Sequence, residues 1–351
     1  MERWQKHLFI LILLFFISGN PVWCSNDKVT GDLPENAIFW VSSAQEYKNC
    51  TIQAYADAGR RVEAAAKGEK EGTWCVICDA DETLINNIEY ALELEAAGLK
   101  HSSELWDAWC ARAEATAVPG AVEFTKLVHS LGGKVIIITN RHAGNKEGTL
   151  KNLDKLGIVY DACIFKEGIY ENDSLKVMRR KDTMEGKLQG TDLPPLKVLM
   201  LCGDQITDLY NPADMPAEEI RERLSKDFCM LANPTYGSWQ SHPEVFFVRS
   251  GESTGMRIDA KVGQKFIIVL DSNPTTGYDW EFSGLVPESP VMVQDDVFLP
   301  EAPGRMGAGG KKLFWFSADK AGITTLNFEY KRSWEKNVPP LKMKSFEVNV
   351  K

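Results

Sequence analysis

Three acidic residues follow directly on an apolar run near residue 80. The run is Trp74–Cys78, and Asp79, Asp81 and Glu82 come immediately after it. Buried strands rarely end in three carboxylates, and the ligand sites of open α/β sheets lie beyond the carboxyl ends of the strands. A bound metal ion would make such crowding tolerable. The segment therefore indicates a carboxylate site, although a solvated loop with chance acids is an equal alternative for these residues alone.

Two further apolar runs end in polar residues of suitable type. Residues 135–138 lead into Thr139, and residues 198–202 lead into Asp204, with Asp208 four positions later. Strand ends of a parallel sheet meet at one edge, so three strand ends are expected to converge there. This convergence favours a real site over chance acids.

Strands alternating with helices must position these residues. Helical patterns at 54–66 and 121–131 alternate with the apolar runs, which predicts an α/β fold with a parallel sheet. After residue 245 the pattern changes to short alternating strands separated by Gly, Pro, Asn and Asp, which is typical of an all-β sandwich. The predicted strands of this second part are 265–270, 313–317, 323–330 and 346–350.

Length, charge and cysteine content agree with two modules. The chain has 351 residues, 44% hydrophobic and 25% charged, which corresponds to about two domains. Residues 25–245 hold 24 basic and 35 acidic residues (net −11), whereas residues 246–351 hold 14 and 13 (net +1). All eight cysteines lie before residue 230. The overall net charge of −9 argues against a nucleic acid polymer or an anionic membrane as the main partner.

Residues 1–24 have the pattern of a secretory signal peptide. Arg3 and Lys6 precede an unbroken apolar run at 8–17, and small or turn-forming residues follow. Ten apolar residues are too few for the roughly 20 that span a bilayer, so no membrane span is predicted. A lipid anchor at Cys24 is not favoured, because the bulky Trp23 precedes it.

The cysteines do not predict a metal or redox centre. Cys75 and Cys78 form a C-x-x-C pattern, but this spacing places them on opposite faces of one predicted strand. An oxidising compartment would permit disulfides, and the sequence alone does not choose the pairs.

The first module resembles the haloacid dehalogenase (HAD) superfamily. The order D-x-D-x-T, a strand ending in Thr, a lysine, and G-D-x-x-x-D matches its four motifs. Lys166 and Lys176 compete for the lysine position, and the S-x-K-x-x-R-R context favours Lys176. The resemblance narrows to the class C acid phosphatases and covers most of residues 35–243. Further matching stretches are 43–47, 106–124, 174–180 and 233–239.

This resemblance implies a fold and an activity. The fold is a HAD-like Rossmannoid parallel sheet with a small helical cap over residues 30–243. Members are bacterial, exported, Mg²⁺-dependent phosphomonoesterases that act at acidic pH, often lipid-anchored and often active on nucleoside monophosphates. The expected location is therefore periplasmic, outer-membrane-associated or secreted.

The resemblance also implies roles for individual residues. Asp79 is the expected nucleophile and Asp81 the general acid and base. The expected metal-site residues, with Asp81 acting through its backbone carbonyl and Asp208 placed behind, are Asp79, Asp81, Asp204 and Asp208. The expected phosphate- or substrate-binding residues are Thr139, Asn140, Lys176 and Tyr236. Trp106 and Trp109 are either stacking residues or core residues, and Arg141 and His142 lie close enough to reach a substrate, but His142 is not included in the site.

Three polar loops of the second module carry its functional signal. They read N-P-T-T-G-Y at 273–278, G-A-G-G at 307–310 and R-S-W at 332–334. In their order and spacing they resemble the loops of the chagasin family of cysteine-protease inhibitors, which implies an immunoglobulin-like sandwich over residues 246–351 that fills the cleft of papain-like proteases. Ser333 departs from the family, which has Pro there. The expected protease-binding residues are Asn273, Pro274, Thr275, Thr276, Gly277, Tyr278, Gly307, Gly309, Gly310, Arg332 and Trp334.

The sequence therefore predicts an exported Mg²⁺-dependent acid phosphatase fused to an inhibitor of papain-like cysteine proteases. Its partners would be a small phosphomonoester and a protease. The alternative is a phosphate-binding or adhesion scaffold whose main activity is protease inhibition.

Overall fold

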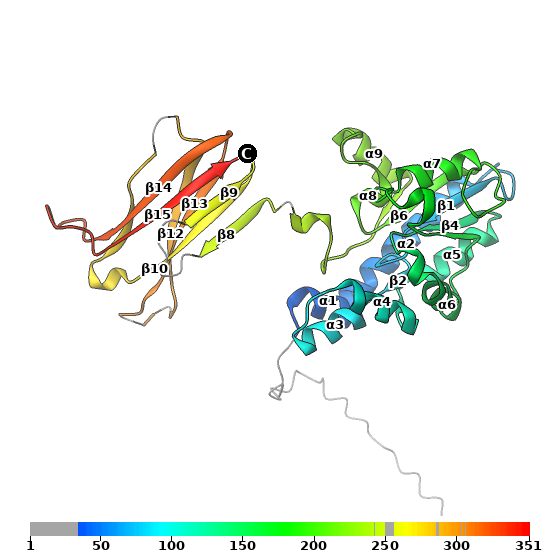
Figure 1. Cartoon of the computed structure of the whole chain (residues 1–351), viewed down its shortest axis with the longest axis horizontal. Helices are drawn as coiled ribbons and strands as arrows, with labels where there is room; N and C mark the ends of the chain where they lie inside the picture. Colours follow the sequence, from blue (N-terminus) through cyan, green and yellow to red (C-terminus); the bar gives the residue numbers. More distant parts are fainter. Residues whose placement is uncertain (1–33, 242, 250–255, 286–287, 303, 306) are drawn as a thin grey trace, which may run out of the picture. The chain divides into compact units, whose positions relative to one another are not determined.

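The computed structural model describes residues 34–241, 243–249, 256–285, 288–302, 304–305 and 307–351 (Figure 1). These residues form two compact units, each built on its own sheets. The predicted signal peptide at 1–24, including Cys24, lies outside the described residues. Within the described part of the chain, no helix is both long and apolar enough to cross a membrane.

The first unit contains a five-stranded sheet. Its strand order is β5-β4-β1-β6-β7, and the pairings of β1 with β4, β1 with β6 and β4 with β5 are parallel. All five residues of β1 are buried, as expected for a central parallel strand that is covered on both faces. The strands are β1 (Trp74–Cys78), β4 (Lys134–Ile138), β5 (Ala162–Ile164), β6 (Lys197–Gly203) and β7 (Phe228–Met230).

Helices connect these strands, and a small insertion follows β1. The insertion comprises β2 (Ile85–Asn86), α3 (Ile88–Ala97), α4 (Ser103–Arg112) and β3 (Thr116–Ala117), with β2 and β3 paired antiparallel. It supplies the predicted small helical cap. The remaining helices are α1 (Asn36–Ser43), α2 (Gln45–Ala65), α5 (Ala121–Ser130), α6 (Lys146–Leu156), α7 (Val177–Glu185), α8 (Ile206–Leu209) and α9 (Ala217–Lys226).

The second unit is a sandwich of two four-stranded sheets. Their orders are β12-β13-β10-β8 and β11-β14-β15-β9. Most pairings are antiparallel, but β8 runs parallel to β10 and β9 parallel to β15. The strands are β8 (Val245–Arg249), β9 (Met256–Ala260), β10 (Lys265–Ser272), β11 (Asp279–Phe282), β12 (Val291–Pro300), β13 (Gly310–Ala318), β14 (Gly322–Lys331) and β15 (Lys342–Val350).

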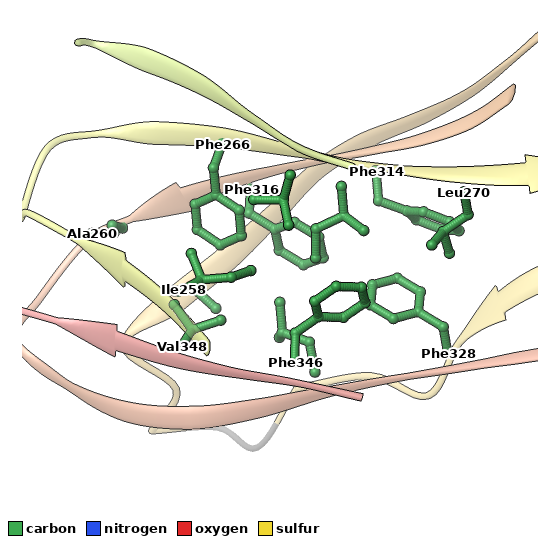
Figure 2. Packing of buried hydrophobic residues seen from close by; sticks show 14 of the residues in the cluster. Ile258, Ala260, Phe266, Leu270, Phe314, Phe316, Phe328, Phe346 and Val348 are labelled. Carbon is green, nitrogen blue, oxygen red and sulfur yellow. The ribbon is translucent and has the colours of Figure 1, made fainter. Parts of the chain in front are cut away.

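Aromatic side chains fill the space between the two sheets of the sandwich. Phe266 and Phe316 come from one sheet and Phe328 and Phe346 from the other, and each is at most 1% exposed (Figure 2). The rings of Phe266 and Phe316 stack with their centroids 5.2 Å apart, and Phe328 meets Phe346 edge to face at 5.7 Å. Such ring pairs add to the stabilisation that area burial alone provides.

The predicted strands all occur, and the structure extends most of them. The sandwich begins with β8 at Val245, one residue before the predicted boundary at 246. The sequence did not predict β12, because most of its residues are exposed along one edge of its sheet and carry no period-two pattern.

Candidate functional site

Three carboxylates converge at the carboxyl ends of β1 and β6. Oxygen atoms of Asp79, Asp204 and Asp208 all lie within 4.8 Å of one another. The two strands are adjacent with Cys78 and Cys202 in register, and the Asp79 amide donates a 2.9 Å hydrogen bond to the Cys202 carbonyl oxygen. The loops that follow β1 and β6 therefore begin at the same edge of the sheet. Clustered carboxylate oxygens are the donor set that Mg²⁺ prefers, so these residues fit the implied metal.

The turn after β6 holds Asp204 and Asp208 in place. The Gln205 amide donates to Asp208 Oδ2 at 2.9 Å, which forms the cap of α8. A Cβ at Gly203 would lie 2.2 Å from Asp208 Cβ, so only glycine fits there. The side-chain amides of Gln205 and Asn233 donate to Asp204 Oδ2 at 2.7 and 2.9 Å. Sequence reasoning assigned no role to Gln205 or Asn233, although Asn233 opens one of the family-like stretches.

Lys176 is the lysine that contacts Asp79. Its Nζ lies 2.5 Å from Asp79 Oδ1, and both residues are buried. Lys176 precedes α7 with φ of +58°, a left-handed conformation that is costly for a residue with a side chain. Backbone strain of this kind persists where the surroundings enforce it, often at functional sites. Lys166 contacts the loop after β4 through its backbone: its amide donates to the Arg141 carbonyl oxygen at 3.0 Å.

Arg179 fixes the loop that follows β4. It is fully buried and donates to the Thr139 carbonyl oxygen at 2.5 Å and to Asn140 Oδ1 at 2.8 Å. Burial lowers the pKa of Arg179, and its hydrogen bond and ion pair with Asp173 offset part of that effect. The Thr139 hydroxyl oxygen accepts from the Arg141 amide at 3.1 Å. Arg179 therefore orients both predicted phosphate-binding residues of this loop, a role that the S-x-K-x-x-R-R pattern alone did not reveal.

Asp81 points to a different set of partners. Its carboxylate accepts from Arg141 Nη2 at 2.6 Å, from Arg141 Nε at 3.0 Å and from Asn87 Nδ2 at 2.9 Å. Burial would lower the pKa of Arg141, but the attraction of Asp81 outweighs it and raises the pKa above its ordinary value. The side chain of Asp81 is thus outside the cluster formed by the other three carboxylates, and its backbone-carbonyl role stays a prediction.

The predicted aromatic residues divide into a buried and an exposed group. Trp109 is 3% exposed and donates from Nε1 to Asn87 Oδ1 at 2.9 Å, so it supports the partner of Asp81. The ring of Trp106 lies 5.1 Å from the Arg141 guanidinium. Tyr236 is 42% exposed, and its carbonyl oxygen accepts from Gln205 Nε2 at 3.4 Å. Of these three aromatic residues, Tyr236 is therefore the exposed one, and it lies on the loop that orients Asp204.

The described cysteines are free thiols. Cys78, Cys202 and Cys229 are buried in the adjacent strands β1, β6 and β7. Burial and the two neighbouring thiols raise the pKa of Cys202 well above its ordinary value. Burial likewise raises the pKa of Cys75. Thiols held protonated in this way are poor metal ligands and poor nucleophiles.

The first predicted protease-binding loop is tightly turned. Asn273 Oδ1 accepts from the Thr275 hydroxyl at 2.6 Å, and the Asn273 carbonyl oxygen accepts from the Thr276 hydroxyl at 2.7 Å. Pro274 begins a short 3₁₀ helix, and Gly277 ends it with φ of +84°. These contacts preorganise the exposed turn between β10 and β11.

The three predicted loops meet at one end of the sandwich. Asn273 Nδ2 donates to the Gly307 carbonyl oxygen at 3.3 Å, which joins the first and second loops. Arg332 Nη2 donates to the Thr276 carbonyl oxygen at 3.2 Å, which joins the first and third. Trp334 is 64% exposed. We call residues 273–278, 307–310 and 332–334 together the loop edge.

Replacing Lys176 with Met should lower kcat about 100-fold or more, because a buried positive charge beside Asp79, the predicted nucleophile, is lost. Steady-state kinetics with a phosphomonoester would measure this. The matched control is Lys181→Met, which removes an exposed lysine of α7, the helix that follows Lys176, and should leave kcat unchanged. A loss below about tenfold in Lys176→Met would contradict the electrostatic role.

Replacing Gly277 with Ala should weaken protease inhibition about tenfold, because a left-handed residue gains a Cβ. That Cβ would lie 2.5 Å from Cη2 of the Trp334 ring. The inhibition constant against papain measures the effect. Gly263→Ala is the control, since Gly263 has φ of +91° but nothing within 4 Å of its Cβ position. Equal effects of the two substitutions would show that the contact with Trp334 is unimportant.

A parallel α/β sheet with a small cap, a buried aspartate held by a lysine, and two further carboxylates define a phosphomonoesterase. The second unit is an immunoglobulin-like sandwich of protease-inhibitor type. The chain belongs to the HAD superfamily, subfamily IIIB (acid phosphatase), whose family model matches residues 33–239, and its last part belongs to the chagasin family of peptidase inhibitors (I42), matched over residues 259–350.

Individual relatives agree with both assignments. Chagasin from Trypanosoma cruzi is 35% identical over 83 residues, which cover 23% of this chain and 76% of chagasin. Amoebiasin-2 from Entamoeba histolytica is 29% identical over 86 residues, 24% of this chain and 68% of that protein. The class C acid phosphatase from Bacillus anthracis shares the fold of the first unit, with a TM-score of 0.51 and 24% identity over 58% of this chain and 85% of that one. The predicted family, fold class and phosphomonoesterase activity are confirmed.

Proposed function

We propose that the first unit hydrolyses small phosphomonoesters at acidic pH with Asp79 as nucleophile and Mg²⁺ as cofactor. The single observation that carries this proposal is the 2.5 Å contact between Lys176 Nζ and Asp79 Oδ1 beside two further carboxylates. A buried aspartate so placed is oriented as a nucleophile, and the lysine offsets negative charge as a phosphate approaches.

The reaction proceeds in two displacements. Asp79 attacks phosphorus, the bond from phosphorus to the leaving oxygen breaks, and an aspartyl-phosphate forms. Asp81 gives a proton to the leaving oxygen, and then as a carboxylate takes a proton from the water that attacks phosphorus of the aspartyl-phosphate. The bond from phosphorus to the Asp79 oxygen then breaks, which releases phosphate and restores the Asp79 carboxylate. Its hydrogen bonds with Arg141 and Asn87 hold the carboxylate in one orientation. Thr139 and Asn140 bind phosphoryl oxygens from the loop that Arg179 fixes.

The metal would be held by Asp79, Asp204 and the backbone carbonyl of Asp81, with Asp208 behind. When bound, Mg²⁺ neutralises negative charge on the phosphoryl oxygens. The chain's own residues orient these ligands: Asn233 and Gln205 hold Asp204, and the α8 cap holds Asp208.

Nucleoside monophosphates are the proposed substrate class, supported by the exposed Tyr236, which lies on the loop whose Asn233 contacts Asp204. The experiment is phosphate release at acidic pH from a panel of nucleoside monophosphates, 4-nitrophenyl phosphate and glycerol phosphate. The Tyr236→Ala variant should raise KM for nucleotides and leave KM for glycerol phosphate unchanged. Absence of turnover on every ester would instead support a phosphate-binding scaffold.

We propose separately that the loop edge inhibits papain-like proteases by filling their active-site cleft. The convergence of the three loops through Asn273 and Arg332 supports it. Preorganised loops bind with a smaller entropic cost than flexible ones. Titration of papain with the full chain tests the proposal, and saturable nanomolar inhibition is expected. Binding without inhibition would favour an adhesion or docking domain.

Residues 1–24 are proposed to direct export, with the mature protein periplasmic, outer-membrane-associated or secreted. The basic residues followed by ten apolar ones support this. Mass spectrometry of the protein recovered from expressing cells tests it. Retention of residues 1–24 on protein recovered from the cytoplasm would contradict export.

A further inference from the structure

In the third loop of the loop edge, one residue differs from the chagasin family at a position that affects the stiffness of the backbone. Residues 332–335 form a turn, closed by a 3.1 Å hydrogen bond from the Glu335 amide to the Arg332 carbonyl oxygen. Ser333 occupies the second position of this turn, where proline is favoured because it fixes φ. The serine leaves this backbone angle free, so the turn needs stabilisation from elsewhere.

Arg332 supplies contacts to the turn and to the neighbouring loop. Within the turn, its Nη1 donates to Glu335 Oε1 at 2.9 Å. Across the gap between loops, its Nε and Nη2 donate to the Thr276 carbonyl oxygen at 3.3 and 3.2 Å. The guanidinium also lies 4.5 Å from the centre of the Tyr278 ring, a cation–π distance.

These contacts engage all three nitrogen atoms of the Arg332 guanidinium. The planar guanidinium reaches a carboxylate, a carbonyl oxygen and an aromatic face at once, which a lysine could not do. Its side chain is only 36% exposed, and that of Glu335 is 29% exposed. Trp334 belongs to the same turn as Arg332, and its ring packs against Gly277 of the first loop. Arg332 thus contacts the third loop through Glu335 and the first loop through Thr276 and Tyr278.

We propose that Arg332 is a positioning residue that replaces the missing proline and holds the first and third loops as one rigid surface. It acts through Thr276 and Trp334. This inference rests on the proposed inhibitory function of the loop edge and names the residue that preorganises it.

A double-mutant cycle tests the proposal with the full chain and papain. The four proteins are wild type, Arg332→Ala, Ser333→Pro and the double variant. Arg332→Ala should weaken inhibition about tenfold, mainly through a faster koff. The effect of Ser333→Pro on inhibition should be roughly two- to fivefold more favourable in the Arg332→Ala background than in the wild type, because stiffness is then limiting. An equal effect of Ser333→Pro in both backgrounds would overturn the proposal.

A second measurement does not depend on inhibition. Hydrogen exchange of the free full chain should become faster at residues 274–278 in Arg332→Ala, because Thr276 loses its cross-loop partner. Arg257→Ala is the matched control, since this arginine lies on β9 and forms an exposed pair with Asp259 at 3.4 Å. Unchanged exchange in Arg332→Ala would overturn the proposal. If the wild type fails to inhibit papain, the inhibitory function is wrong, while the exchange comparison still decides whether Arg332 couples the loops.

Discussion

Replacing Asp79 with Asn should reduce kcat for phosphomonoester hydrolysis by at least about 10⁴-fold, because an amide cannot form the aspartyl-phosphate. The substitution preserves size and keeps an oxygen within reach of Lys176, whose Nζ lies 2.5 Å from Asp79 Oδ1. The loss should therefore appear in kcat rather than in KM. Phosphate release from 4-nitrophenyl phosphate under saturating conditions measures it, and rapid quenching should detect no phosphorylated protein.

The sandwich provides an internal control for this variant. Asp79→Asn should inhibit papain as well as the wild type, because the loop edge has its own core and its own hydrogen bonds. Equal inhibition shows that the sandwich of the variant is folded, and an unchanged thermal melt of the phosphatase unit would show the same for the part that carries Asp79. Residual activity above about 1% in a folded Asp79→Asn protein would mean that another group is the nucleophile.

Removing divalent metal with EDTA should lower phosphatase activity about 10³-fold, and Mg²⁺ should restore it. Oxygen atoms of Asp79, Asp204 and Asp208 lie within 4.8 Å of one another, so their charges repel unless a cation is bound. The same repulsion predicts that Mg²⁺ raises the melting temperature of the phosphatase unit. Activity assays and thermal melts with and without EDTA measure both effects.

Asp204→Asn separates metal binding from other effects of the chelator. This variant should need a higher Mg²⁺ concentration for half-maximal activity, because one anionic ligand is lost. Asp214→Asn is the matched control: its carboxylate accepts from Asn211 on the exposed segment after α8. Full turnover in EDTA by protein free of bound metal would refute the metal requirement. Papain inhibition should not respond to EDTA in any of these proteins.

The sequence predicts which residues form the candidate site better than it predicts the hydrogen-bond and ion-pair partners of those residues. Asp79, Thr139 and Asp204 each follow an uninterrupted apolar run, and parallel pairing then brings the three strand ends together. Periodicity therefore locates them without knowledge of the loops.

Other contacts depend on tertiary structure that no local pattern encodes. Asp81 and Arg141 are 60 positions apart, and their ion pair depends on how the loops after β1 and β4 fold at the edge of the sheet. Arg332 and Thr276 are joined across 56 positions by a side-chain contact to a backbone oxygen. Local sequence patterns predict neither contact, because they do not show which distant side chain or backbone oxygen a residue meets in the folded chain.

The row of thiols formed by Cys78, Cys202 and Cys229 constrains how this chain reaches its folded state. Each is shielded from solvent only once β1, β6 and β7 have assembled. In an unfolded chain all three would be accessible to oxidants, and a crosslink between any two would compete with native strand pairing. Correct folding in an oxidising environment would therefore require β1, β6 and β7 to assemble faster than these thiols are oxidised.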